Sequence, residues 1–176
     1  MNQKAIEITP ALTVHTLLET YPELEEVLIG MAPPFKKLRN PFLRNSVAKV
    51  ATIKHISSVG KIPLNELVNT LREAVGQPPI TEDYVEENYF GEQPKWFSVD
   101  KITLSLDESK LADKNTMTLV TLLSEAKNVN QGEIIELITS FLPAPGIDIL
   151  KAKGYSVWTL KESEDLIKSY FLKNSD

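Results

Sequence analysis

The 176-residue sequence predicts a two-domain α+β protein. Apolar residues repeat at helical spacing through residues 1–76, whereas residues 99–176 alternate strand and helix patterns. Between these regions, residues 77–98 combine prolines, acidic residues and aromatic residues. We therefore expect an N-terminal all-α bundle of about five short helices, a linker, and a C-terminal two-layer α/β sandwich.

Residues 9–31 predict the first two helices. Thr13 is a suitable N-cap for the first helix, which should end at Tyr21 because the following proline disfavours helical geometry there. We expect Gly30 to end the second helix. The apolar stripe of the second helix consists of Leu24, Val27, Leu28 and Met31.

The rest of the first domain contains further helix signals. Asn40 and Pro41 suit an N-cap and a first helical position, and Thr52 can cap another helix that ends near Gly60. The clearest helix begins at Pro63 and ends at Gly76. In the linker, aromatic residues should anchor the chain to a domain, and they are Tyr84, Tyr89, Phe90, Trp96 and Phe97.

The second domain reads as βαβαββ. Strands are predicted at 101–107, 133–139, 155–161 and 166–173, and helices from Asn115 or Thr116 to about Ala126 and from Pro143 to Lys153. The first strand should bury Ile102, Leu104 and Leu106. The apolar residues of the first helix are Met117, Val120 and Leu123, with Leu119 and Leu122 as further candidates for its buried face. An acidic turn over residues 162–165 joins the last two strands. A βαβ unit followed by a hairpin gives a four-stranded mixed sheet with both helices on one face.

Composition excludes several kinds of chemistry. The sequence has no cysteine, which rules out disulfides, thiolate metal sites, persulfide carriers and thiol nucleophiles. No segment has the 18 or more apolar residues of a membrane helix, and no signal sequence is recognisable, so we expect a cytoplasmic protein without a membrane partner. The net charge of -5 argues against nucleic acid as the main partner.

One cationic segment contrasts with this acidic total, because no acidic residue occurs between Glu26 and Glu66. Its basic residues lie near two predicted helix starts, where backbone N–H groups can hold an anion. A phosphate-like ligand or an acidic protein surface would fit, and a solvated surface is the alternative. The candidate binding residues are Pro33, Pro34, Phe35, Lys36, Lys37, Arg39 and Arg44.

A second candidate lies where the second helix of the C-terminal domain begins. The residues Ser140, Phe141, Pro143 and Pro145 could line a groove for a partner or a small ligand, although proline at a helix start also has a purely structural role. A serine–lysine pair, Ser109 with Lys110 or Lys114, is the weak alternative for a nucleophile. Neither His15 nor His55 has metal-like spacing, so we expect no metal, no cofactor and no catalytic residue. The carboxylates Glu162, Glu164 and Asp165 fit a solvated hairpin tip better than general acid catalysis.

Residues 94–173 resemble the TusA/SirA-like fold, and more closely an uncharacterised TusA-related branch. The similarity is carried by Pro94-Lys95-Trp96, Leu106-Asp107, Gly132-Glu133, Pro143-Ala144-Pro145 and Gly154-Tyr155. TusA-type carriers use a cysteine at the start of their first helix. The corresponding region here runs from Lys110 to Met117 and contains no thiol, so the resemblance implies the fold without the sulfur-carrier activity.

Residues 8–76 resemble a small helical domain of unknown function that is related to the amino-terminal domain of iron–sulfur repair proteins. The matching segments are Tyr21-Pro22-Glu23-Leu24, Met31 to Leu38, and Asn40-Pro41-Phe42-Leu43-Arg44. Some of those relatives carry cysteines in the loop that corresponds to residues 30–35, where this chain has Pro33, Pro34 and Phe35. We therefore expect a bacterial, non-catalytic accessory or binding protein. The alternatives are a cysteine-free group-transfer enzyme in sulfur or nitrogen-oxide metabolism and a nucleic-acid-binding regulator.

Overall fold

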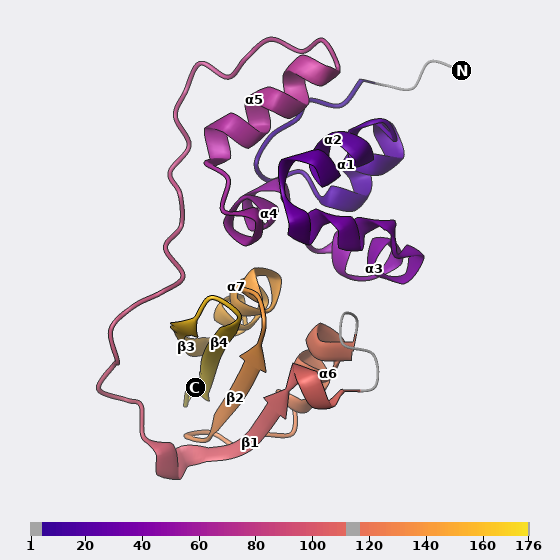
Figure 1. The fold of residues 1–176 in the computed structure, drawn as a ribbon. Coiled ribbons are helices and arrows are strands. Elements are labelled where there is room, and N and C mark those ends of the chain that lie inside the picture. The colour runs from indigo at the N-terminus through magenta and orange to yellow at the C-terminus, as the bar shows by residue number, and fades with distance from the viewer. Residues whose placement is uncertain (1–4, 112–116, 176) are drawn as a thin grey trace. The chain divides into compact units, whose positions relative to one another are not determined.

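The computed structural model describes residues 5–111 and 117–175. The chain divides into two compact units, Met1–Glu87 and Asn88–Asp176. The first unit is helical and the second combines helices with a sheet, which confirms the predicted α+β layout (Figure 1). The division falls inside the segment 77–98.

The first unit contains five α-helices in its described part, as the sequence predicts. They are α1 (Val14–Thr20), α2 (Leu24–Met31), α3 (Pro41–Asn45), α4 (Ile53–Gly60) and α5 (Leu64–Ala74). Two 3₁₀ helices, η1 (Pro33–Arg39) and η2 (Val47–Lys49), connect them. One apolar core, which includes Leu17, Leu28, Ile53 and Leu67, holds the helices together.

Local capping explains several of the helix boundaries. The Thr13 hydroxyl accepts a hydrogen bond from the Thr16 amide at 3.2 Å, and α1 ends at Tyr21 as predicted. Thr52 and His55 form a reciprocal capping box at the start of α4. Gly76 follows α5 with a φ of 73°, a conformation that glycine adopts without strain. The prediction that Gly30 ends α2 is wrong, because the helix continues to Met31.

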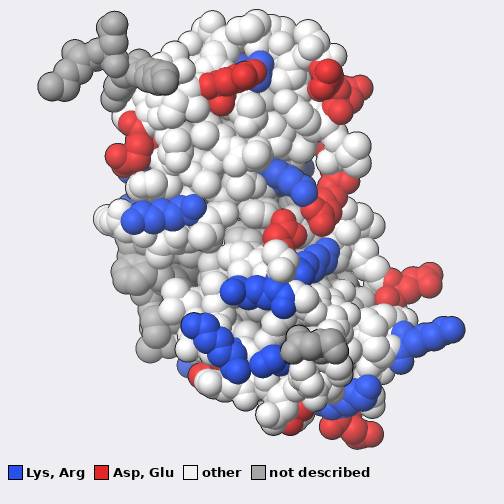
Figure 2. Space-filling view, turned by 180° about the vertical axis from the view of Figure 1, so that it is seen from behind, with Lys and Arg blue, Asp and Glu red and all other residues white. Residues whose placement is uncertain are grey.

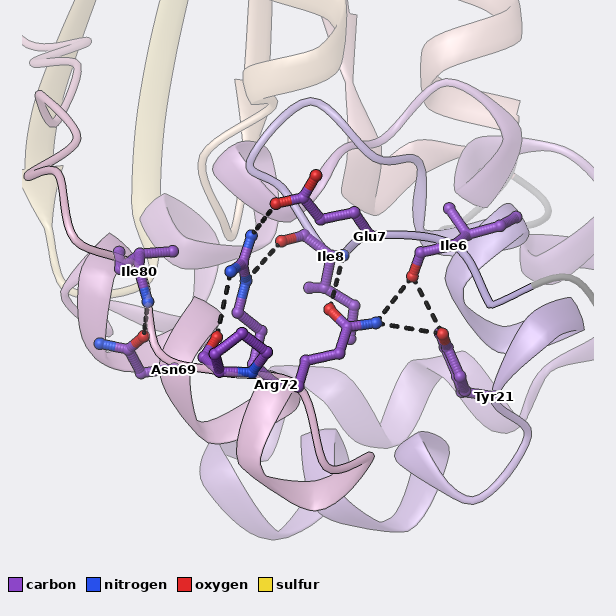
Figure 3. Close-up of polar contacts among 9 residues, drawn as sticks. Ile6, Glu7, Ile8, Tyr21, Asn69, Arg72 and Ile80 are labelled. Carbon is purple, nitrogen blue, oxygen red and sulfur yellow. Dashed lines mark hydrogen bonds and ion pairs between the residues drawn. The ribbon is translucent and has the colours of Figure 1, made fainter.

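The N-terminal segment and the residues after α5 are tied to this unit by polar contacts (Figure 3). The Gln77 side chain accepts from the Ile8 amide at 3.0 Å and donates to the Ile6 carbonyl at 2.8 Å. Further along, Asn69 and Asn65 accept hydrogen bonds from the amides of Ile80 and Tyr84. Tyr84 also packs against the core, so residues 77–87 belong to the first unit.

The second unit has the predicted βαβαββ order. Its sheet has the strand order β1-β2-β4-β3, with β1 (Ile102–Asp107), β2 (Ile134–Thr139), β3 (Tyr155–Ser163) and β4 (Leu166–Lys173). Strands β1 and β2 are parallel, and β4 is antiparallel to both of its neighbours. The helices are α6 (Met117–Glu125) and α7 (Ala144–Ala152), with the 3₁₀ helices η3 (Val99–Lys101) and η4 (Glu108–Lys110) on either side of β1.

Both helices cover the same face of the sheet. Leu122 of α6 and Leu150 of α7 share a core with Ile135, Leu137 and Phe171 of the strands. The predicted position of Val120 in this core is wrong, since its side chain is exposed. The predicted cap residues of α6, Asn115 and Thr116, lie outside the described residues.

The opposite face of the sheet carries a smaller apolar cluster. Ile134, Trp158 and Tyr170 form its buried part, and Trp96 and Phe97 from the segment before β1 pack onto them. Ile102 joins this cluster rather than the helix-side core, because the register between β1 and β2 shifts between Ile102 and Leu104. A second difference from the prediction is that β3 extends into the acidic turn, to Ser163.

Residues 88–98 are packed against the second unit. The Tyr89 hydroxyl donates to Asp148 at 3.1 Å, and the Trp158 indole donates to the Gly91 carbonyl at 2.8 Å. Phe97 makes edge contacts with Trp158 and Tyr170, at centroid distances of 4.7 and 4.6 Å. These contacts bear out the expectation that the linker aromatics anchor the chain.

Candidate functional site

The basic segment lies on η1 and α3, but not at the helix starts that the sequence suggested. Lys36, Lys37 and Arg39 occupy the last turn of η1, and Arg44 the last turn of α3. Helix ends present carbonyl groups, which favour cations and offer no N–H groups to an anion. An anion at this segment would therefore be held by side chains.

Two consecutive glutamates of α2 each pair with one arginine of this segment. Arg39 contacts both carboxylate oxygens of Glu26 at 3.1 Å, and Arg44 contacts Glu25 at 2.7 Å. The Arg39 and Glu26 side chains are 61% and 72% exposed, whereas those of Arg44 and Glu25 are 31% and 18% exposed. An exposed ion pair contributes little to stability, so Arg39 can exchange its partner at small cost.

The remaining residues of this candidate site differ in accessibility. Lys36, Lys37 and Pro33 are exposed and Pro34 is half-buried. Phe35 is only 3% exposed and belongs to the core, next to Gly60. Phe35 therefore cannot offer its ring to a ligand.

On the face drawn in Figure 2, acidic and basic side chains are both spread over a mostly uncharged surface.

The second candidate site gains a residue that the sequence reasoning missed. Glu108, in η4 at the carboxyl end of β1, accepts hydrogen bonds from the amide and the hydroxyl of Ser140, both at 2.9 Å. Ser140 is exposed, Phe141 and Pro145 are half-buried, and Pro143 is buried. Of the predicted groove, the structure therefore shows the exposed hydroxyl of Ser140, which is bonded to the buried carboxylate of Glu108. Pro143 lies at the start of α7, where it fixes the backbone.

Ser109 and Lys110, considered as a nucleophilic pair, each bind Asp107, whereas the other lysine considered, Lys114, lies outside the described residues. Ser109 donates from its hydroxyl to Asp107 at 2.7 Å, and the Lys110 ammonium pairs with the other oxygen of Asp107 at 3.3 Å. The hydrogen bonds from Ser109, together with Lys110, lower the pKa of Asp107 below its usual value. Asp107 therefore stays a carboxylate that binds both groups, and Lys110 is not oriented to act as a base toward Ser109.

A polar row crosses the open face of the sheet, meaning the face without helices. Strand register aligns Ser105, Glu136, Tyr170 and Trp158 across all four strands. Ser105 donates to one oxygen of Glu136 at 2.6 Å, and Tyr170 donates to the other at 3.2 Å. Burial, followed by the nearby charges of Glu136 and Glu162, raises the pKa of Tyr170 to about 12. The tyrosine is therefore a hydrogen-bond donor at neutral pH.

Several of the other titratable groups that the sequence singles out have structural partners. His55 accepts the Thr52 amide within the capping box, and the acidic hairpin carries the ion pairs Lys161–Glu164 and Lys168–Glu162. Within residues 5–111 and 117–175, no group of three or more His, Asp or Glu side chains is arranged to hold a metal ion. In the same ranges, no helix has the length and apolar character to cross a bilayer.

Comparison with known protein families gives a match for one part of the chain. Residues 8–68 match the model of a domain of unknown function, DUF1858. The match lies within the first unit and confirms the expected helical domain of unknown function there. No curated protein and no solved structure matches the chain.

Proposed function

We propose that this protein is a cytoplasmic, non-catalytic accessory or binding protein that recognises an anionic ligand or an acidic protein surface through its basic segment. The observation that carries the proposal is that, among the described residues, Arg39 is held only by an exposed ion pair with Glu26, while Arg44 pairs with the adjacent Glu25. Lys36 and Lys37 are exposed on the same 3₁₀ helix as Arg39. An acidic group that displaces Glu26 would bind Arg39 in its place.

The second unit enters the proposal as a TusA-like scaffold without its sulfur chemistry. The strand order, the two helices on one face and the short motifs agree with such a relationship. The chain has no thiol to carry sulfur, and Ser109 and Lys110, one pair that a substitute group-transfer reaction could use, are both bound to Asp107. A binding role is therefore better supported than a group-transfer activity.

Calorimetric titration of the full chain tests the binding role, with inorganic pyrophosphate and a polyglutamate peptide as probes. The double variant Lys36→Glu/Lys37→Glu should weaken binding by at least about tenfold. Lys127→Glu/Lys153→Glu, two exposed lysines of the second unit, is a matched control with the same change in net charge and should bind normally. Equal loss in both double variants, or no binding by the wild type, would remove the proposed site.

Intact-mass measurement of protein isolated from its native host tests the non-catalytic part. We expect the mass of the unmodified chain. A covalent adduct on a serine or lysine would favour the group-transfer alternative. In the titrations, a single-stranded oligonucleotide that binds more tightly than the polyglutamate peptide would favour the nucleic-acid-binding alternative.

A further inference from the structure

We propose that the open face of the second unit's sheet docks a segment of a partner protein that places an arginine or lysine on Glu136, with apolar side chains around it. This inference rests on the binding role proposed above. It goes beyond that proposal because it assigns a second surface, in the other unit, to a partner of opposite charge.

Glu136 is fixed in position by its two neighbours. It lies on β2, and it receives hydroxyl donors from β1 on one side and from β4 on the other, one to each carboxylate oxygen. Tyr170 itself is 6% exposed and stacks on Trp158 at a centroid distance of 5.1 Å, which limits its movement. Because the fold already holds this carboxylate in place, little further side-chain entropy is lost when it accepts a hydrogen bond from a partner.

The charge of Glu136 has no cationic partner among the described residues of the unit. Two nearby acids on the sheet have cationic partners, Asp107 with Lys110 and Glu162 with Lys168. Among the residues that the structure describes, Glu136 receives hydrogen bonds from hydroxyl groups and pairs with no lysine or arginine. Each of its oxygens has a further lone pair, so a guanidinium can bind both of them.

The surroundings of Glu136 are more apolar than a solvated sheet face requires. An antiparallel sheet with one covered face usually alternates apolar residues inward with polar residues outward. Here the outward positions include Leu160, Leu172 and Ile134, and the chain uses Trp96 and Phe97 to cover part of them. Leu160, Leu172 and Trp96 remain half-exposed. Apolar side chains on the β3–β4 side of a fixed carboxylate match a protein segment with a cation next to apolar side chains.

Other occupants fit this surface less well. A phosphate backbone would be repelled by the unpaired charge of Glu136. A second copy of this chain would present the same face, and Lys168 on that face is already paired with Glu162. Charge complementarity therefore favours a different protein with a basic residue at the centre of its contact.

A double-mutant cycle on the full chain tests the inference. The probe is a synthetic amphipathic helical peptide with a leucine stripe and one central arginine, compared with the same peptide carrying glutamine there. Fluorescence of Trp96 and Trp158, which lie in the cluster beside Glu136, reports binding directly. The arginine peptide should bind the wild type about tenfold more tightly than the glutamine peptide. The difference should disappear in Glu136→Gln and persist in Asp165→Asn, an exposed acid at the hairpin tip.

Three results would overturn the inference. The two peptides could bind equally, the preference for arginine could survive in Glu136→Gln, or sedimentation could show that a second copy occupies the face. Pyrophosphate titration separates this inference from the proposed function. If the wild type binds pyrophosphate but shows no preference for the arginine peptide, only the second surface is removed. Glu136→Gln should bind pyrophosphate as the wild type does. A covalent adduct on the native protein would remove the non-catalytic role and leave the peptide result standing.

Discussion

The guanidinium of Arg72 donates from Nε to the main-chain carbonyl of Ile8 at 2.8 Å, across 64 positions of sequence. The same group donates to the Pro78 carbonyl at 3.1 Å and to the Glu7 carboxylate at 2.8 Å (Figure 3). Arg72 is buried, so these acceptors balance a charge that would otherwise be costly inside the protein. One side chain of α5 thus holds both the N-terminal segment and the start of residues 77–87.

Replacing Arg72 with alanine should lower the free energy of unfolding of the first unit by about 2 kcal/mol, because the buried carbonyl of Ile8 loses its donor and the bonds to Pro78 and Glu7 are lost as well. Urea unfolding followed by circular dichroism at 222 nm measures this. Glu7→Ala is the control, since the Glu7 side chain is 73% exposed and its loss should cost less than about 1 kcal/mol. Equal effects of the two variants would show that the main-chain acceptors contribute nothing.

Two helical glycines should respond in opposite ways to alanine. A Cβ atom at Gly60 would lie 2.6 Å from Cζ of Phe35, whose ring is buried and cannot withdraw. Gly60→Ala should therefore destabilise the first unit by about 1–3 kcal/mol. A Cβ atom at Gly30 would meet nothing within 4 Å, so Gly30→Ala should stabilise α2 by up to about 1 kcal/mol.

Thermal unfolding of both glycine variants measures these effects. Phe35→Leu in the Gly60→Ala background should recover part of the loss, because the shorter side chain makes room for the new methyl group. A Gly60→Ala protein as stable as the wild type would mean that the ring of Phe35 can move, and that Phe35 is less firmly part of the core than its burial indicates.

The helix ends show which boundaries a sequence can reveal. Thr13 and Thr52 cap their helices through bonds to residues three positions away, so the signal is local. Gly30 misled the prediction because glycine inside a helix costs only about 1 kcal/mol. Helix α2 ends at the extended backbone of Ala32, which Pro33 imposes on the residue before it.

The candidate sites of the second unit depend on contacts that no short window contains. Glu108 and Ser140 are 32 positions apart, and Glu136 and Tyr170 are 34 apart. The strand pattern predicts which residues share a face, but the register between strands decides which carboxylate meets which hydroxyl. The predicted burial of Val120 is wrong for a related reason. Helix α6 is apolar on more than one side, and its orientation is set by the packing of Leu119 and Leu122 near Gly146 of α7.

Phe97 should be as important to the second unit as a core residue of the sheet, although it precedes the first strand. Phe97→Ala should destabilise that unit by about 2 kcal/mol, because Trp158 and Tyr170 lose their covering ring. Trp158 is 8% exposed in the native protein, so its emission should shift to longer wavelength. Val99→Ala is the control, because Val99 is 69% exposed and its loss should change stability by less than about 0.5 kcal/mol. Unchanged emission in Phe97→Ala would contradict the packing of residues 94–98 on the sheet.

Tyr170 should make the stability of the second unit depend on pH in the alkaline range. Its pKa is raised to about 12 in the folded protein, against an ordinary value of 10.0 for tyrosine. Between these values the unfolded chain loses the phenolic proton and the folded chain keeps it, so unfolding becomes more favourable as the pH rises. The stabilising contribution of the neutral phenol is complete below pH 10 and disappears as the pH approaches 12.

Comparison of the wild type with Tyr170→Phe isolates this contribution from that of lysines, which titrate in the same range. The free energy of unfolding of the second unit, followed by tryptophan fluorescence at several pH values from 9 to 12, should fall more steeply in the wild type. Glu136→Gln should make the fall less steep, because the negative charge of Glu136 is one cause of the raised pKa of Tyr170. Parallel curves for the wild type and Tyr170→Phe would mean that the phenol ionises alike in the folded and unfolded chains. Tyr170 would then not be the buried donor that holds Glu136 in place.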